Sequence, residues 1–117
     1  MVDKISKWEI YFCNLNPAEG SEQQGVRPVI IISNDAVNYN LPVSTAIPLS
    51  SAKPDDKIYP TEIFLPADIT GLKKDSVAML QQIRTISHSR LKNKSGIIEN
   101  KDYREKIIEA LKAYFEF

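Results

Sequence analysis

Alternating apolar and polar positions predict a first β-strand from Trp8 to Leu15, ended by Asn16-Pro17. Within it, Ile10 and Phe12 share one face, while Tyr11, Cys13 and Leu15 share the other. Because both faces carry apolar side chains, we expect the strand to be partly covered on both sides.

The next apolar segments predict a central strand and a third strand. The β-branched run from Pro28 to Ile32 is typical of a central strand, and the polar residues after it can cap a short helical turn through Asn38. A third strand is expected from Ser44 to Leu49. Pro48 within it indicates an edge or a bend, because proline has no N–H to donate to a ladder.

Two further strands and a helix complete the predicted architecture. After a polar loop at residues 52–60, strands are expected from Thr61 to Leu65 and from Ser76 to Ile83, across a turn with Gly71. From Asn100, a plausible cap, the pattern becomes helical, with an apolar stripe of Tyr103, Ile107, Leu111, Tyr114 and Phe115. We therefore expect a mainly β fold with a strongly bent antiparallel sheet, closed on one side by a C-terminal helix.

Length and composition narrow the class of protein. The 117 residues predict a single domain, residues 1–117, and fifteen acidic residues cancel fifteen basic ones. The chain therefore lacks the strongly positive net charge that by itself would indicate nucleic-acid binding. Its single cysteine, Cys13, excludes an intramolecular disulfide, and no signal segment or membrane-spanning run is apparent. A cytoplasmic protein is expected.

The loop before the central strand has the character of a phosphate-binding element. Gly20 and Gly25 bracket it, and Pro28 pushes Arg27 towards the extended region. A guanidinium presents a planar fork of donors that matches a phosphate, and Glu22 could orient that fork or act as a base. The alternative is a hairpin loop with a solvated salt bridge.

A basic stretch is hidden in the neutral chain. No acidic residue lies between Asp75 and Glu99, yet Arg84, Arg90, Lys92 and Lys94 do. This stretch could neutralise the phosphates of a nucleic acid, or it could be a solvated loop surface. His88 within it is expected at the surface. Candidates for stacking on unpaired bases are Trp8, Phe12, Tyr39 and Tyr59, although core packing is the alternative for each.

Absent motifs restrict the chemistry. A lone histidine cannot supply a two-histidine nuclease, no carboxylate cluster suits Mg²⁺, and the P-loop and Gly-x-Ser-x-Gly motifs are missing. What remains is an arginine, a glutamate and hydroxyls, which suit a reaction whose nucleophile belongs to the substrate. The 2′-hydroxyl of RNA is such a nucleophile, and no metal or cofactor would be needed.

Three ordered motifs resemble the MazF/PemK/Kid toxins: the loop Gly20 to Val29, then Ser33-Asn34-Asp35 with Asn38, and Gln82 to Ile86. The resemblance runs from about Trp8 to the C-terminus. It implies a small SH3-like barrel of the PemK/CcdB toxin type that forms a homodimer. It also implies a ribosome-independent, sequence-specific endoribonuclease that acts on single-stranded RNA and leaves 2′,3′-cyclic phosphate and 5′-hydroxyl ends.

The same resemblance implies partners and site residues. The expected partner is an antitoxin whose acidic, partly disordered segment competes with RNA, and the pair is expected to bind DNA for autoregulation. Arg27, Ser50 and Glu22 correspond to catalytic positions, with a serine at Ser50 where many members carry threonine. The expected RNA-binding residues are Phe12, Ser21, Ser51, Thr61, Gln81, Gln82 and Arg84.

Besides Ser50, the chain departs from the family pattern at three further places. Gln81 stands where many members carry an acid and Met79 where one branch has an arginine, so a carboxylate and arginine pair from that strand is unavailable. Altered base recognition is the preferred interpretation, since an amide both donates and accepts. Lys7-Trp8-Glu9 replaces the usual Arg-Gly-Asp, and Trp8 is expected to pack on a dimer partner or the C-terminal helix.

Two other functions remain open from the sequence. The first is a non-catalytic toxin with the same barrel that binds DNA gyrase, because fold alone does not decide function. The second is a decayed nuclease that only binds antitoxin or RNA. Retention of Glu22, Arg27 and a hydroxyl at Ser50 favours the nuclease.

Overall fold

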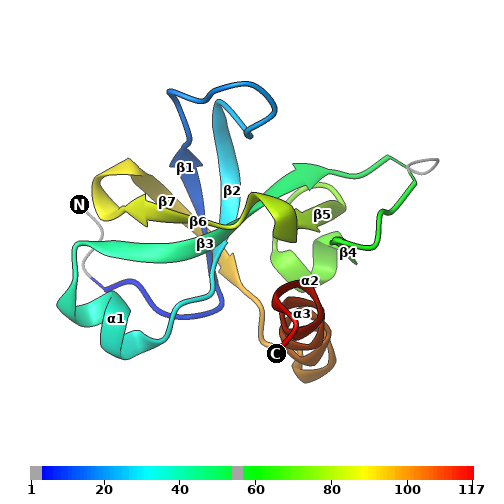
Figure 1. The fold of residues 1–117 in the computed structure, drawn as a ribbon. Helices are drawn as coiled ribbons and strands as arrows, with labels where there is room; N and C mark the ends of the chain where they lie inside the picture. The colour runs from blue at the N-terminus through cyan, green and yellow to red at the C-terminus, as the bar shows by residue number, and fades with distance from the viewer. Residues whose placement is uncertain (1–3, 54–56) are drawn as a thin grey trace.

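The structure, a computed structural model, describes residues 4–53 and 57–117, so the predicted loop at 52–60 lies partly outside the described residues. Its strands are β1 (Glu9–Asn14), β2 (Val26–Ile31), β3 (Val43–Ser51), β4 (Glu62–Leu65), β5 (Ser76–Met79), β6 (Arg84–Ser87) and β7 (Leu91–Ile97). The helices are α1 (Asp35–Asn40), α2 (Ala67–Thr70) and α3 (Lys101–Phe115), with 3₁₀ turns η1 (Leu80–Gln82) and η2 (His88–Arg90) (Figure 1).

One antiparallel sheet runs through the molecule in the order β4-β5-β3-β2-β1-β7, and β6 pairs with β3 beside β5. The sheet is strongly bent, and its end strands β4 and β7 are not neighbours in the order that the described residues give. The expected mainly β fold with a C-terminal helix is confirmed, although the barrel is not fully closed. In Figure 1, α3 lies beside α2 and β4.

The bend is centred on Pro48, as its position predicted. Before the bend, β3 pairs with β2, and the last partners in that ladder are Pro48 and Val29. After it, residues Leu49 to Ser51 pair with β5 instead. Since Ile32 N–H donates to the Thr45 carbonyl, the backbone of Pro48 faces away from β2, and its missing donor falls between the β6 and β5 ladders on the other edge of β3. Each half of β3 therefore belongs to a different part of the sheet.

Two apolar cores cover the two faces of the sheet. One includes Ile10, Ile30, Ile47, Leu49 and Ile107 of α3, and the other includes Tyr11, Cys13, Val29, Ile31 and Ile86. The alternation predicted for the first strand is thereby confirmed. The stripe on α3 packs through Tyr103, Ile107 and Leu111, but Tyr114 and Phe115 are 41% and 45% exposed. Their rings contact each other edge to face instead.

The segment after β5 differs from the sequence prediction. The strand expected from Ser76 to Ile83 ends at Met79, because the Ile83 N–H donates to the Leu80 carbonyl at 3.1 Å and the chain tightens into η1. β6 and β7 then follow where only a basic stretch was recognised. Leu91 is the one buried residue of β7, so the polar composition of this end strand gives no strand pattern in the sequence.

His88 is half-buried rather than a surface residue, which corrects the sequence expectation. Its Nε2 lies 2.8 Å from the hydroxyl of buried Ser44, and that hydroxyl donates to Asn38 Oδ1 at 2.7 Å. Ser33 donates to the same amide oxygen at 2.6 Å, so this network ties the start of β3 to α1. Burial lowers the pKa of His88, and its backbone contact with Val43 opposes that shift.

Trp8 adopts a backbone conformation that favours glycine, with a φ of 77°. Its N–H donates to the Ile31 carbonyl at 2.7 Å, and its own carbonyl accepts from Ile98 at 2.9 Å, which fixes this geometry. The indole is 8% exposed in the core, with the Arg104 guanidinium of α3 at 5.3 Å from the ring. The expected packing on the C-terminal helix is confirmed, and burial of the ring offsets the backbone strain.

The positive φ of Trp8 predicts that a glycine variant is more stable than an alanine variant, although alanine is usually the more stabilising of the two. Trp8→Ala and Trp8→Gly both lose the buried ring, at a cost of about 3–5 kcal/mol in the free energy of unfolding. Glycine also relieves the left-handed strain, so Trp8→Gly should be more stable than Trp8→Ala by about 1 kcal/mol. Urea unfolding followed by circular dichroism at matched protein concentration measures the difference. An alanine variant as stable as the glycine variant contradicts the strained assignment.

Candidate functional site

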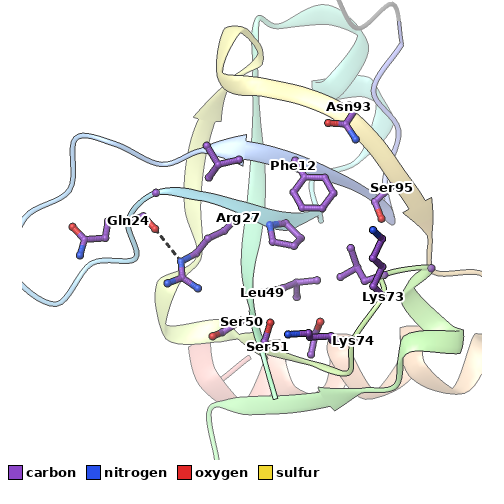
Figure 2. A pocket seen from close by; sticks show the side chains of 16 residues that line it. Phe12, Gln24, Arg27, Leu49, Ser50, Ser51, Lys73, Lys74, Asn93 and Ser95 are labelled. Atoms are coloured by element: carbon purple, nitrogen blue, oxygen red, sulfur yellow. Dashed lines mark hydrogen bonds between the residues drawn. The ribbon is translucent and has the colours of Figure 1, made fainter. Parts of the chain in front are cut away.

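A groove of about 790 Å³ opens beside the bend in β3. Figure 2 shows side chains from several parts of the fold facing it. Phe12 comes from β1, Arg27 follows the glycine loop on β2, and Ser50 and Ser51 end β3. The opposite side is formed by Lys73 and Lys74 of the turn after α2 and by Asn93 and Ser95 of β7.

Arg27 is held by the backbone of its own loop. Gly25 has a φ of 82°, its N–H donates to Asn16 Oδ1 at 2.9 Å, and its carbonyl accepts from Leu15 at 2.9 Å. The Arg27 Nε then donates to the Gln24 carbonyl at 2.9 Å. Because Nε is occupied, the Nη groups are the donors that remain for a ligand such as phosphate.

Ser50 and Ser51 lie between two hollows. They line the groove, and they also line a smaller hollow of about 300 Å³ together with Lys57, Tyr59, Glu62, Val77 and Met79. Had the ladder between β2 and β3 continued beyond Val29 and Pro48, Ser50 would stand opposite Arg27. The strands diverge there, so the serine hydroxyls and the guanidinium border a gap rather than a continuous sheet.

The charge of the groove is positive although the chain is neutral. Its described lining contains three cationic side chains, Arg27, Lys73 and Lys74, and no carboxylate. Asp75 follows the lysines, but its Oδ1 accepts from the Ala67 N–H at 2.9 Å at the start of α2. A cationic groove with hydroxyls and an aromatic ring suits a single-stranded nucleic acid.

Glu22 and its neighbours form a loop that Gln82 clamps. Gln82 Oε1 accepts from the Gln23 N–H at 3.2 Å, and its Nε2 donates to the Ser21 carbonyl at 3.1 Å. The Glu22 carboxylate accepts from the Glu19 N–H at 2.7 Å and is not part of the groove lining. The structure thus places Arg27, Ser50, Ser51 and Phe12 together and leaves Glu22 and Ser21 on the adjoining loop.

Most of the basic stretch is engaged within the protein. Arg84 Nη1 reaches the Leu15 carbonyl at 3.5 Å, and Arg90 Nη1 donates to the carbonyls of Asn14 and Asn16. Lys94 forms a 2.6 Å ion pair with Glu9. These contacts hold the base of the β1–β2 loop and neutralise part of the charge that the sequence pattern assigned to nucleic acid.

Two buried side chains near the base of the β1–β2 loop, Cys13 and Tyr11, have raised pKa values. Burial raises the pKa of the Cys13 thiol, and the charges of Arg90 and Arg84 lower it in part. Burial also raises the pKa of Tyr11, and the nearby Glu9 carboxylate, which accepts from the Tyr11 hydroxyl at 3.1 Å, raises it further. Both groups therefore stay protonated at neutral pH and act as packing elements.

The remaining sequence candidates fall into different surroundings. Gln81 is exposed on η1, and Thr61 is half-buried next to the smaller hollow. Of the aromatic candidates, Phe12 lines the groove and Tyr59 lines the smaller hollow. Trp8 lies in the core, and Tyr39 of α1 hydrogen-bonds Ser6. Two of the four are thus placed to stack on a base.

Sequence reasoning missed the side of the groove opposite Arg27. Lys73 and Lys74 follow Gly71, which gave a turn signal but no reason to place the turn near Arg27. Asn93 and Ser95 lie on β7, a strand that the polar pattern concealed. Among residues 4–53 and 57–117, no group of three or more His, Cys, Asp and Glu could hold a metal ion, and no helix is long and apolar enough to cross a membrane.

Comparison with known proteins gives matches along most of the chain. A family model described as "PemK-like, MazF-like toxin of type II toxin-antitoxin system" matches residues 6–115. A Bacillus subtilis protein named Endoribonuclease EndoA is 36% identical over 107 residues, which cover 92% of this chain and 90% of the relative. Endoribonuclease MazF of Staphylococcus saprophyticus is 38% identical over 101 residues, covering 86% and 83%.

Solved structures share the fold. A crystal structure of MazF from Deinococcus radiodurans superposes with a TM-score of 0.79 at 24% identity and covers 99% of this chain and 100% of that one. A mycobacterial endoribonuclease in complex with its cognate antitoxin gives a TM-score of 0.77 at 20% identity, covering 97% and 96%. At these identities the likeness concerns the fold alone.

The clamp on the loop generates a prediction that needs no substrate. Gln82→Ala removes the acceptor of the Gln23 N–H and the donor to the Ser21 carbonyl. Loss of about 1.4 kcal/mol of local stability should speed hydrogen exchange of the Gln23 amide roughly tenfold. Gln81→Ala, at the exposed neighbouring position, is the matched control and should leave that rate unchanged. Equal rates in the two variants would mean that the clamp does not hold the loop.

Proposed function

The chain belongs to the PemK-like, MazF-like family of type II toxins, and from this premise we propose that it is a sequence-specific endoribonuclease. Its substrate is single-stranded RNA, which it cleaves without the ribosome or a metal ion. The observation that carries the proposal is the groove in which the Arg27 guanidinium and the Ser50 and Ser51 hydroxyls border one positively charged gap.

The proposed reaction uses a nucleophile that the substrate supplies. The 2′-oxygen of one nucleotide attacks the adjacent phosphorus as its proton passes to water, and the bond to the 5′-oxygen of the next nucleotide breaks as that oxygen takes a proton from water. The products are a 2′,3′-cyclic phosphate and a 5′-hydroxyl. Arg27 stabilises the charge that develops on the phosphoryl oxygens, and Ser50 donates a further hydrogen bond there.

Glu22 and the amides have supporting roles in this proposal. In the described conformation the Glu22 carboxylate binds the Glu19 N–H, so it reaches the scissile phosphate only if the loop moves. Gln82 and Arg84 contribute by holding that loop and its base. Gln81, exposed beside them, is the residue that we assign to base recognition.

Partners follow from the same groove. We infer that an acidic, disordered segment of a cognate antitoxin competes with RNA for the three cationic side chains. A mycobacterial endoribonuclease of the same fold is known in complex with its antitoxin, which supports this inference. Homodimer formation, a cytoplasmic location and autoregulatory DNA binding with the antitoxin remain predictions.

The first prediction for this function concerns the nucleophile. Purified protein should cleave single-stranded RNA in the presence of EDTA, and a substrate with 2′-deoxy residues should stay intact because no 2′-hydroxyl is present to attack. Gel analysis of end-labelled oligonucleotides measures both. Cleavage of the deoxy substrate, or a requirement for Mg²⁺, would refute the chemistry. Intact RNA together with inhibited DNA gyrase would instead favour the non-catalytic toxin, and intact RNA that still binds would favour a decayed nuclease.

The second prediction ranks the groove residues. Arg27→Ala should lower kcat about 10²–10³-fold, as loss of one preorganised donor commonly does. Arg27→Lys keeps the charge but not the fork, so it should restore only part of the rate. Ser50→Ala should lose more activity than Ser51→Ala, and Ser50→Thr should remain active because it keeps the hydroxyl. Single-turnover kinetics measure the cleavage rate of each variant. A larger loss of rate in Ser51→Ala than in Ser50→Ala would contradict the assignment of Ser50.

A further inference from the structure

We propose that Lys73 and Lys74 form a second phosphate site, which holds the RNA linkage adjacent to the one that is cleaved. Both lysines line the groove, and Figure 2 shows Lys73 beside Ser95, on the side away from Arg27, and Lys74 below Leu49 near Ser51. The inference rests on the proposed function, because it assigns a second contact to the same RNA. It explains why positive charge sits at two separate places in one groove.

The turn that carries the lysines is fixed by its own hydrogen bonds. Gly71 has a φ of 79° and its N–H donates to the Ala67 carbonyl at 2.9 Å, and Leu72 N–H donates to Thr70 Oγ1 at 3.1 Å. Asp75 closes the turn through Ala67, and its carbonyl accepts from Ala52 at 2.9 Å. The two lysines therefore extend from a preorganised backbone.

Close packing against β7 places this turn at the groove. A Cβ on Gly96 would lie 2.6 Å from the Thr70 carbonyl oxygen, and one on Gly71 would lie 3.4 Å from the Ser95 carbonyl oxygen. Such a close approach requires glycine at Gly96. The end of α2 thus rests directly on β7, which brings the turn with Lys73 and Lys74 to the groove that Asn93 and Ser95 also line.

Both lysine charges are open to a ligand. Both side chains are exposed, and the ion pairs found among the described residues engage Lys94 with Glu9 and Lys112 with Glu109 instead. Asp75, the acid nearest in sequence, is directed to the start of α2. Two ammonium groups in a groove whose described lining has no carboxylate attract an anion, and phosphate is the anion that RNA repeats along its backbone.

The space between the two cationic places fits a nucleoside. The half-buried ring of Phe12 supplies a stacking surface, and the amide of Asn93 and the hydroxyl of Ser95 line the polar side. A groove of about 790 Å³ exceeds what one phosphate needs. We therefore place one base on Phe12, the scissile phosphate at Arg27 and the neighbouring phosphate at Lys73 and Lys74.

Binding of an uncleavable RNA isolates this site from the chemistry. The probe is a fluorescent RNA with a single 2′-deoxy residue at the cleavage position, and anisotropy gives its Kd across a salt series. Lys73→Ala/Lys74→Ala should weaken binding several-fold and reduce the slope of log Kd against log salt by about 0.7 for each phosphate that is no longer neutralised. The matched control is Lys92→Ala/Lys101→Ala, which removes the same charge from exposed positions outside the groove lining.

Replacing single phosphates of the RNA by uncharged linkages identifies the phosphate that Lys73 and Lys74 bind. A methylphosphonate placed at each linkage in turn should weaken binding to the unsubstituted protein at the scissile linkage and at one neighbour. In Lys73→Ala/Lys74→Ala the neighbour should no longer matter, while the scissile linkage still does.

Three outcomes would overturn the proposal. They are the same salt slope in the lysine and control variants, equal sensitivity at every linkage, and unchanged RNA binding with lost affinity for an oligo-glutamate peptide. The last would assign the pair to an acidic protein segment. If the protein binds RNA but never cuts it, the proposed function fails while the lysine effect is still measured.

Discussion

The site depends on the point at which β3 can no longer pair with β2. Pro28 and Pro48 lie on the two facing strands, and the last partners of that ladder are Val29 and Pro48. Pro28 has no N–H to donate across to Leu49, so the two strands separate there, and β3 continues in its ladder with β5 on the other edge. Arg27 and Ser50, which a longer ladder would have paired, instead border open space. The ligand groove is the gap left by an interrupted hydrogen-bond ladder.

The sequence predicted those elements whose apolar pattern is local. The first strand, the central strand, the bend at Pro48 and the start of α3 at Asn100 all follow from alternation, β-branching, a missing donor or a cap. β7 was missed because its residues Lys92, Asn93 and Lys94 are polar and exposed at the end of the sheet. The turn at η1 was read as strand because Leu80 is buried in either conformation.

Charge was the least predictable property of the site. Arg84, Arg90 and Lys94 are close in sequence, but carbonyls at residues 14–16 and the Glu9 carboxylate engage them. Those partners lie far away along the chain, so no local pattern announces them. By contrast, the sequence around Lys73 and Lys74 indicates only a turn, and the tertiary fold places both lysines at the groove. The positive potential of the groove therefore depends on which cationic side chains have no partner within the described part of the protein.

The β1–β2 loop is tied to one later segment at both of its ends. Arg84 and Arg90 hold its base, and Gln82 holds its tip, so the segment from 82 to 90 contacts the loop at each place. Loop and segment must therefore be inherited together. An exchange of loop sequence between relatives would transplant recognition only if residues 82–90 travelled with it, because a foreign loop would arrive without its supports.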